Sequence, residues 1–176
     1  MTKTRLTASL RVAPRPTSED SPLDELDRRL IVLLQANGRA THRELAAQVD
    51  LSPPGLQKRL HKLEERGIVR GYTALIDRQA LGLDLLCFVQ VTLAHHEPEM
   101  IQGFREQLAL IPEVLECHHL TGEFDYLMKV VVKNHKHLER FLFDDLTPIP
   151  GVDKVRTSIV LREIKESTVL PVDGIG

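Results

Sequence analysis

The sequence lacks most of the features that mark exported, disulfide-stabilised or membrane-inserted proteins. Its 176 residues include two cysteines, Cys87 and Cys117, which make no disulfide framework and lack the CxxC spacing of a metal site. The longest apolar runs, such as residues 85–89, fall far short of the roughly 20 residues that cross a bilayer. No basic start followed by a hydrophobic stretch and a small-residue cleavage site is present. We therefore expect a cytoplasmic protein with no membrane partner.

The net charge is also close to zero, but the positive and negative residues are distributed unevenly along the chain. The formal charge is −2 with 42% hydrophobic residues, which excludes a disordered chain. Residues 1–70 carry 13 Lys and Arg against 9 Asp and Glu, whereas residues 71–176 carry 10 against 16. A basic half joined to an acidic half favours contact of the first half with a polyanion. Four of the basic residues lie in the first 15 positions, however, so the asymmetry alone does not establish nucleic-acid binding.

Two short helices are predicted after an aperiodic tail at residues 1–22. Asp24 can cap a helix whose leucines recur with the helical period, and Gly38 is expected to end it in a left-handed conformation. Thr41 and Glu44 form the T-x-x-E capping box of the second helix. The buried faces of these helices are expected to contain Leu26, Leu30, Leu33, Leu34, Leu45, Ala46 and Val49.

A third helix has the two faces that a DNA-recognition helix needs. Ser52 and Pro53 provide its N-cap and first turn, and the helix is expected to run to about residue 66. Leucines at positions 56, 60 and 63 face the domain, and polar or cationic side chains lie opposite. Together with the tight junction to the second helix, this arrangement describes a helix-turn-helix unit. The predicted DNA-contacting residues are Arg43, Ser52, Pro54, Gln57, Lys58, His61 and Lys62.

Each of these residues can also be an ordinary solvent-exposed residue with no role in DNA binding, because any surface helix has a solvated polar face. Gln57 has the amide geometry that suits adenine, and the neighbouring lysines can neutralise phosphates. Ser52 can cap the helix, bind phosphate, or do both. Arg59 lies beside the buried leucines and is expected to brace Glu64 or Asp27 instead of DNA.

After residue 67 the hydrophobic period changes from that of helices to that of strands. Residues 68–77 are expected to form an extended connector and residues 79–84 a short turn. Strands are predicted at 85–93, 114–120, 126–133 and 152–165, with helices at 98–110 and 135–146. This order predicts an α+β protein whose second domain is a βαββαβ ferredoxin-like sandwich. Both helices would cover one face of the sheet, so we expect a second copy of the chain to cover the other.

The segment LSPPGLQKRLHKLEERGIVRG at residues 51–71 resembles the Lrp/AsnC family of bacterial and archaeal transcription regulators. So do the motifs Leu26-Asp27, Asn37-Gly38-Arg39, Tyr72-Thr73-Ala74, Glu116-Cys117-His118, Gly122–Tyr126 and Pro150-Gly151-Val152. The resemblance covers residues 23–167. It implies an N-terminal helix-turn-helix domain, a hinge strand, and a C-terminal RAM-type domain that binds amino acids. It also implies dimers that assemble into octamers or other larger oligomers. The implied boundaries are 1–22 for the tail, 23–70, 71–84 for the hinge, 85–167, and 168–176 for a C-terminal tail.

The turn between the second and third strands is the candidate site for an amino acid. Gly122 lets backbone N–H groups approach a carboxylate, and Asp125 offers an acceptor for the ammonium group. Ordinary hairpin chemistry explains the same residues, so the ligand role depends on the family resemblance. The predicted effector-binding residues are Leu120, Gly122, Glu123, Phe124, Asp125, Tyr126, Thr157 and Ser158.

The sequence therefore predicts a DNA-binding transcription regulator whose assembly or DNA affinity responds to an apolar or branched-chain amino acid. The alternatives are an architectural protein that wraps DNA without effector control, and an enzyme similar to the tetrapyrrole decarboxylases that share this fold. No catalytic constellation and no cofactor motif is apparent. The histidine pairs at 95–96, 118–119 and 135/137 do not share a face, so no metal site is expected.

Overall fold

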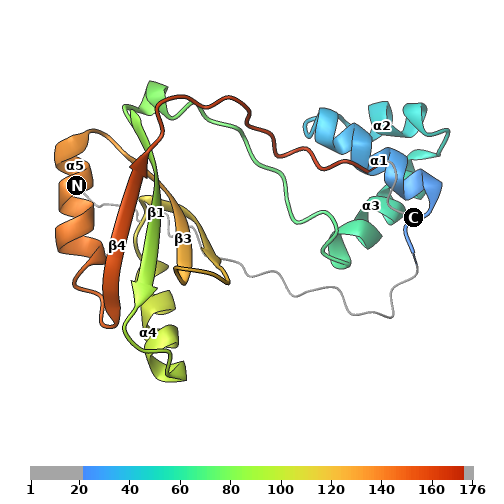
Figure 1. Ribbon diagram of the computed structural model, residues 1–176. Helices are drawn as coiled ribbons and strands as arrows, with labels where there is room; N and C mark the ends of the chain where they lie inside the picture. Colours follow the sequence, from blue (N-terminus) through green and yellow to red (C-terminus); the bar gives the residue numbers. More distant parts are fainter. Residues whose placement is uncertain (1–21, 173–176) are drawn as a thin grey trace, which may run out of the picture. The chain divides into compact units, whose positions relative to one another are not determined.

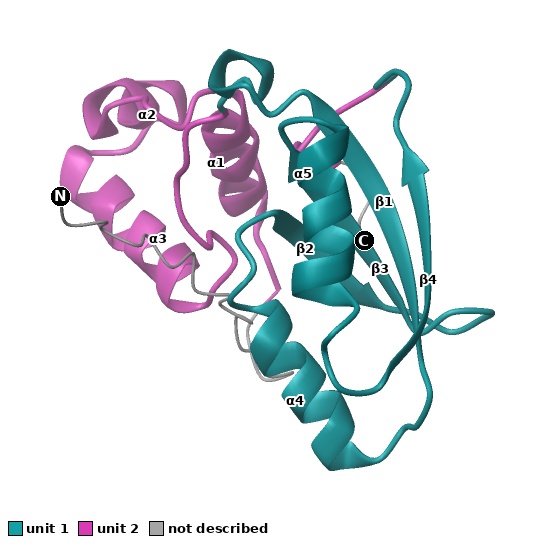
Figure 2. Cartoon of the chain, turned by 90° about the vertical axis from the view of Figure 1, so that its left-hand side faces the viewer, with its two compact units in different colours: residues 1–10, 76–164 teal, residues 11–75, 165–176 magenta. Residues whose placement is uncertain are grey.

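The computed structural model describes residues 22–172, which form two compact units. The helical unit contains residues 22–75 together with residues 165–172, and the sheet unit contains residues 76–164 (Figures 1 and 2). The predicted tail at 1–22 lies outside the described residues apart from Pro22. Within the described range, no helix has the length and apolar character needed to span a membrane.

The helical unit is built on three helices whose N-termini are capped by side chains. α1 (Glu25–Ala36) and α2 (His42–Gln48) each begin with a complete capping box, on Asp24 and Thr41 respectively. α3 (Pro53–Glu65) begins with Ser52, whose hydroxyl accepts from the Gly55 amide at 3.3 Å. Each predicted start is thus confirmed. The buried core comprises Leu30, Leu45, Ala46, Val49, Leu56 and Leu60.

The exit from α1 differs from the sequence prediction. The helix ends at Ala36, and the turn is made by Asn37, whose Oδ1 accepts from the Arg39 amide at 3.0 Å. The Asn37 carbonyl also accepts from the Ala40 amide at 3.1 Å. Gly38 is not among the described residues with positive φ, so the predicted left-handed ending at Gly38 is wrong. An Asx turn replaces it because the asparagine side chain supplies the local acceptor.

The junction between α2 and α3 places a non-glycine residue in the left-handed region. Asp50 has φ of 53°, while the following Leu51 amide donates back to the Ala46 carbonyl at 3.1 Å. Because a Cβ disfavours this conformation, Asp50→Gly is expected to raise the free energy of unfolding of the helical unit by about 0.5–1 kcal/mol. Urea denaturation followed by circular dichroism measures the change. A lower stability would show that the Asp50 side chain contributes more than its backbone conformation costs.

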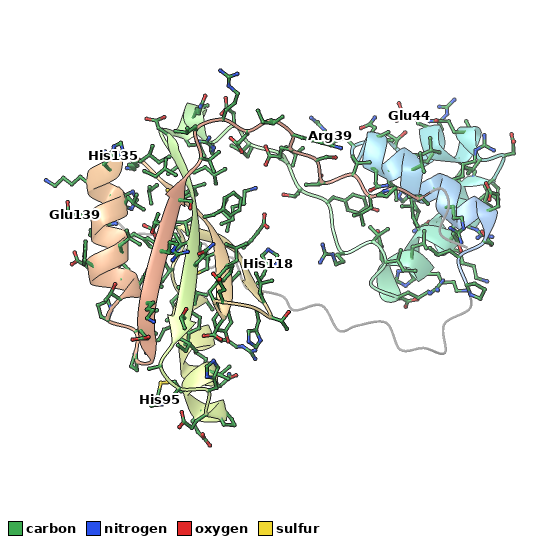
Figure 3. All side chains as sticks on the ribbon, in the orientation of Figure 1. Arg39, Glu44, His95, His118, His135 and Glu139 are labelled. Atoms are coloured by element: carbon green, nitrogen blue, oxygen red, sulfur yellow. The ribbon has the colours of Figure 1, made fainter. Side chains whose placement is uncertain are left out.

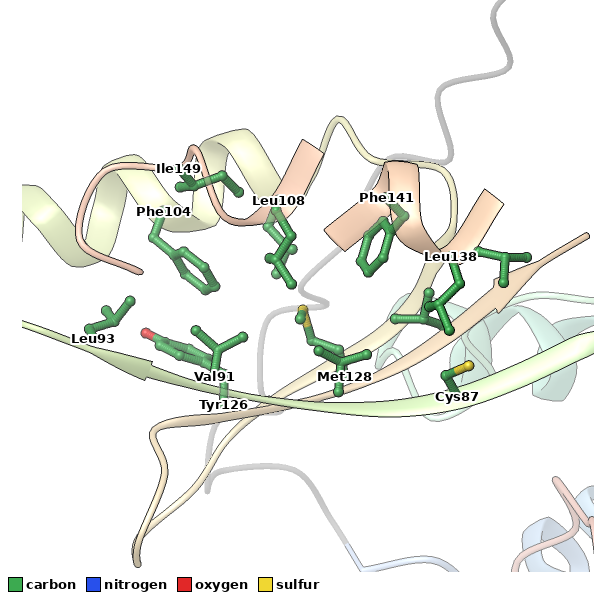
Figure 4. Packing of buried hydrophobic residues seen from close by; sticks show 14 residues of the cluster. Cys87, Val91, Leu93, Phe104, Leu108, Tyr126, Met128, Leu138, Phe141 and Ile149 are labelled. Atoms are coloured by element: carbon green, nitrogen blue, oxygen red, sulfur yellow. The ribbon is translucent and has the colours of Figure 1, made fainter. Parts of the chain in front are cut away.

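The sheet unit is a four-stranded antiparallel sheet with both helices on one face. Its strands are β1 (Leu85–Leu93), β2 (Val114–His119), β3 (Tyr126–Val132) and β4 (Val152–Ile159), in the order β2-β3-β1-β4. A short 3-10 turn (Gln79–Leu81) precedes β1. Helix α4 (Pro98–Leu108) links β1 to β2, and α5 (His135–Arg140) follows β3. Figure 4 shows the apolar side chains of the helices meeting those of β1 and β3, which confirms the ferredoxin-like arrangement.

Two elements of this unit depart from their predicted bounds by more than two residues. The last strand ends at Ile159, six residues before the expected end. The bond from the Val160 amide to the Leu86 carbonyl is the last backbone hydrogen bond between this segment and β1. Leu161 beyond it is 98% exposed. The helix predicted at 135–146 is α-helical only to Arg140 and continues as a π-helical stretch (Phe141–Leu146).

The residues after β4 return to the helical unit and lie along α1. The Gln35 side-chain amide accepts from the Leu170 amide at 2.6 Å and donates to its carbonyl at 3.0 Å. Arg28 donates to the Val172 carbonyl at 3.4 Å. Within the sheet unit, Glu163 pairs with Arg78 at 2.8 Å. This C-terminal segment is therefore held by specific contacts at both of its ends.

The core of the sheet unit contains one buried hydroxyl without a partner among the described residues. Tyr126 is 2% exposed and its ring packs against Phe104 at 4.8 Å, but its hydroxyl makes no hydrogen bond. A buried unpaired polar group costs stability, so Tyr126→Phe is expected to stabilise the unit by about 1 kcal/mol. Thermal unfolding of the variant measures this effect. A lower melting temperature would mean that an ordered water satisfies the hydroxyl.

Candidate DNA interface and ligand-binding turn

The exposed face of α3 carries the residues that the sequence assigned to DNA. Pro54, Gln57, Lys58, His61 and Lys62 are all exposed and recur at helical spacing. The three leucines of the helix, on the opposite side, are buried. Arg43 on α2 and Ser52 are also exposed. The structure thus brings the five α3 residues onto one polar face and leaves each accessible to a partner.

Acidic residues reduce the positive charge of α3 at its C-terminal end. His61 Nε2 lies 3.2 Å from Glu65 Oε1, with both side chains more than 60% exposed. Glu64 accepts from the Tyr72 hydroxyl at 3.1 Å, which fixes the start of the connector against α3. Partial burial and this contact raise the pKa of Tyr72. The cationic character of the exposed face therefore rests on Lys58, in the middle of the helix, and on Lys62, in its last turn.

Arg59 does not face outward but joins α3 to the start of α1. Its Nη1 donates to Asp24 Oδ2 and to Asp27 Oδ1, each at 2.6 Å. The predicted brace to Asp27 is confirmed, whereas the second contact, to Asp24, was not predicted. Hydrogen bonding from Arg59 lowers the pKa of Asp24. Since Asp27 is the one buried charged residue in the described part of the chain, Arg59 supplies its compensating charge.

The turn between β2 and β3 is held in place by backbone bonds at both ends. The Leu120 amide donates to the Asp125 carbonyl at 2.8 Å, and the Asp125 amide donates to the Val91 carbonyl at 3.0 Å. Gly122 has φ of 139°, a conformation that L side chains rarely adopt. These bonds fix the turn at the end of β1 and present its backbone to solvent.

The Asp125 carboxylate is the most strongly held polar group of this turn. Its Oδ2 accepts from the Leu93 amide at 2.7 Å, and its Oδ1 accepts from His96 Nε2 at 2.8 Å. Partial burial opposes ionisation, but the Leu93 amide and His96 outweigh it and leave the pKa of Asp125 below its ordinary value. Neither partner was predicted from the sequence, because Asp125 lies about 30 positions along the chain from each of them and no local sequence pattern links residues so far apart.

The other predicted effector residues do not all lie at this turn. Leu120, Gly122 and Glu123 are exposed and Phe124 is half-buried. The side chain of Tyr126 belongs to the core, where His119 also stacks on it at 4.8 Å. The remaining predicted residues, Thr157 and Ser158, lie on β4.

Thr157 and Ser158 are separated from the turn by β1 within one chain. They pair with Val89 and Phe88, whereas Asp125 contacts Leu93, about 13 Å further along β1. Successive strand residues also face opposite sides of a sheet, so these two side chains cannot line one site together. A single chain therefore brings together the turn residues but not Thr157 and Ser158.

The histidines and cysteines show ordinary structural surroundings. His95 follows β1 and His118 lies on β2, as labelled in Figure 3. Within residues 22–172, no group of three or more His, Cys, Asp or Glu side chains is arranged to hold a metal ion. Burial raises the pKa of Cys117 to about 11, which leaves it as an unreactive thiol.

An exposed cationic helix on a helix-turn-helix unit, linked to a ferredoxin-like sheet unit, defines a two-domain DNA-binding regulator. The family description "Winged helix-turn-helix DNA-binding" matches residues 23–70, and "Lrp/AsnC ligand binding domain" matches residues 86–170. The leucine-responsive regulatory protein of Escherichia coli is 37% identical over 145 residues, which cover 82% of this chain and 88% of that protein.

Solved structures give the same result. A transcriptional regulator from Neisseria meningitidis, in complex with L-Met, superimposes with a TM-score of 0.81 at 38% identity, covering 86% of this chain and 98% of that one. A feast or famine regulatory protein from M. tuberculosis, complexed with L-methionine, gives 0.77 at 34% identity, covering 85% and 99%. The chain belongs to the Lrp/AsnC family of transcription regulators. The similarity extends over both units and not only over the helix-turn-helix.

Proposed function

We propose that the chain binds double-stranded DNA through the exposed face of α3, and that an amino acid bound at the 120–125 turn changes its assembly or DNA affinity. The observation that carries the DNA part is the single exposed polar face of α3, which contains Lys58 and Lys62. The ligand part is supported by the ionised Asp125 beside an exposed glycine turn. Two similar solved regulators contain L-methionine, which favours an apolar amino acid.

In the DNA complex, the side chains of α3 divide between base edges and phosphates. Gln57 has the donor and acceptor geometry to read adenine in the major groove. Lys58 and Lys62 neutralise phosphates and release counterions, and Arg43 extends the same contact onto α2. Pro53 and Pro54 have no N–H and the Gly55 amide is bound by the Ser52 hydroxyl, so Ser52 offers phosphate its exposed hydroxyl and not free helix amides. His61 can contact a base edge or a phosphate once its side chain has separated from Glu65.

Lys58→Ala tests the phosphate contact. The variant is expected to bind DNA several-fold more weakly on every sequence, and the dependence of log affinity on log salt should flatten by about one unit. Fluorescence anisotropy with DNA from the protein's own upstream region, over a salt series, measures both quantities. Lys133→Ala, at an exposed lysine of the sheet unit, serves as the control and should leave the slope unchanged. An unchanged slope in Lys58→Ala would place the contact elsewhere.

The amino acid is expected to bind through three kinds of contact at the turn. Asp125 accepts from the ammonium group, and backbone amides around Gly122 donate to the carboxylate. Leu120 and Phe124 supply apolar surface for the side chain. Binding to one assembly or one DNA-compatible conformation more tightly than another shifts the population toward it. The same argument separates this regulator from an architectural protein, which would bind DNA without responding to any amino acid.

We further propose that a homodimer forms over the sheet face opposite the helices, and that dimers assemble into octamers. On that face Phe88 is 39% exposed and Leu127 is half-buried, whereas their strand neighbours point into the core. Exposed apolar residues on an uncovered sheet face favour burial against a second copy. Ser158, which pairs with Phe88, lies on this face and is available to the turn of another copy, whereas Thr157 pairs with the buried Val89 and faces the other side. Sedimentation velocity with and without the amino acid tests the assembly.

Asp125→Asn provides the test of the ligand site. The amide retains an acceptor for the Leu93 amide but loses the charge that binds an ammonium group. We expect the variant to bind DNA as the wild type does and to lose the response to amino acids, measured as anisotropy with a panel of twenty amino acids. Asp153→Asn, at an exposed residue of β4, is the matched control. An undiminished response of Asp125→Asn would place the effector elsewhere.

A further inference from the structure

Both oxygens of the Asp125 carboxylate are already engaged in the structure. Oδ2 accepts from a main-chain amide of β1 at 2.7 Å, which is a structural contact. Oδ1 is paired with His96, which lies in the loop after β1 and is 60% exposed at its side chain. The Asp125 side chain is 19% exposed. An incoming ammonium group therefore reaches a carboxylate whose outer oxygen already has a side-chain donor.

We propose that His96 is an internal competitor for the ammonium group of the amino acid, so that it sets the affinity of the ligand-binding turn. This inference depends on the proposed function, because it requires that an amino acid binds at Asp125. The ligand class is an α-amino acid, and an analogue without the ammonium group does not compete with His96. When the ligand binds, the imidazole leaves Oδ1 and turns to solvent.

The geometry supports competition because His96 and an ammonium group need the same acceptor. A neutral imidazole donates one N–H to the carboxylate. A protonated imidazole is also positively charged, like the ammonium group of the ligand, so it is held by the carboxylate through charge as well. His96 is exposed on its other sides, so it is displaced without leaving a buried polar group unpaired. Exposed pairs of this kind contribute about 0.5–1 kcal/mol, which corresponds to a two- to fivefold change in affinity.

Protonation strengthens the competitor, so acidification should weaken ligand binding. Histidine side chains commonly change charge between about pH 5 and pH 8. His119 at the end of β2 is the other titratable side chain whose charge acts on Asp125. Along the chain, His95 and Glu97 flank His96 in the same loop, and Glu123 lies in the turn beside Asp125. A dependence due to His96 must therefore disappear when His96 alone is replaced.

The test is isothermal titration of the full chain with L-leucine and L-methionine as probes, at several values between about pH 5.5 and pH 8. His96→Ala is expected to bind about two- to fivefold more tightly than the wild type, with a flatter pH profile. His95→Ala, one residue away in the same exposed loop, is the control and should match the wild type. The affinity for 4-methylpentanoate, which is leucine without its amino group, should be the same in both variants.

The outcomes separate the two proposals. Binding to the wild type with unchanged or weaker binding to His96→Ala would overturn the role of His96 and leave the proposed function standing. Binding to His96→Ala alone would support the competitor in its strongest form. An absence of binding to both proteins would overturn the effector site and the competitor together.

Discussion

Alanine at position 151 is expected to lower the free energy of unfolding of the sheet unit by about 2–4 kcal/mol. Gly151 precedes β4 with φ of 92°, a region that a residue with a Cβ occupies only under strain. The added Cβ would also overlap Met100 Sδ on α4 and lie 2.7 Å from its Cγ. The methionine side chain can move away, but the backbone strain stays. Chemical denaturation of the variant, followed by far-UV circular dichroism, measures the loss.

Gly103→Ala is the matched control for this substitution. Gly103 lies within α4, and a Cβ built there meets nothing within 4 Å. Since alanine has a higher helix propensity than glycine, this variant should gain up to about 1 kcal/mol. Equal stability of Gly151→Ala and the wild type would show that the turn before β4 adjusts to a conformation suited to all residues.

Arg59→Met is expected to destabilise the helical unit by about 2–3 kcal/mol. Methionine keeps much of the apolar stem, but Asp27 loses the guanidinium that compensates its charge. Asp27 is 11% exposed at its side chain, so water replaces the lost contact poorly. Because Arg59 also joins α3 to the start of α1, the variant should lose DNA affinity on every sequence. Thermal unfolding and anisotropy together measure the two effects.

Lys58→Met removes a neighbouring positive charge from the exposed face and is the control for stability. It should unfold at the wild-type temperature, because the Lys58 side chain is exposed. If Arg59→Met is as stable as the wild type, the ion pairs of Arg59 with Asp24 and Asp27 make no net contribution to the free energy of unfolding. Such a result would place Arg59 among the exposed ion pairs of negligible energy.

The same pair gives the helical unit a defined sensitivity to acid. The pKa of Asp24 is lower in the folded protein than in the unfolded chain, chiefly through its bond to Arg59. The contribution of Asp24 is therefore fully present above its unfolded pKa of about 4 and is lost as the pH falls through the folded pKa. We expect a loss of stability below about pH 4 that is smaller in Arg59→Met. An identical acid transition in both proteins would contradict this assignment.

The features predicted correctly from the sequence are those determined by near neighbours. The caps at Asp24, Thr41 and Ser52 each depend on a residue three positions away, and all three were predicted. Strand β1 was predicted with its observed bounds, because a buried central strand is read from its own hydrophobicity. The exposed face of α3 followed from helical periodicity in the same way.

The features that were missed depend on contacts distant in sequence or on backbone choices without a residue signature. The end of β4 is set by where its pairing with β1 stops, which its own β-forming residues do not reveal. Gly38 is the residue type that commonly ends a helix, but the turn after α1 is instead made by Asn37, whose side chain accepts from the Arg39 amide. The partners of Asp125 come from another strand and loop, so local pattern indicated the candidate turn but not the contacts of Asp125 with Leu93 and His96.

The C-terminal segment on α1 has a practical consequence for dissecting this protein. The helical unit is assembled from both ends of the described chain, because Gln35 and Arg28 bind main-chain atoms of residues 170 and 172. A fragment cut after residue 75 would therefore be an incomplete DNA-binding domain, with the Gln35 amide stripped of its partner. A tag or fusion joined directly after residue 172 would begin beside α1, because Arg28 on that helix binds the Val172 carbonyl.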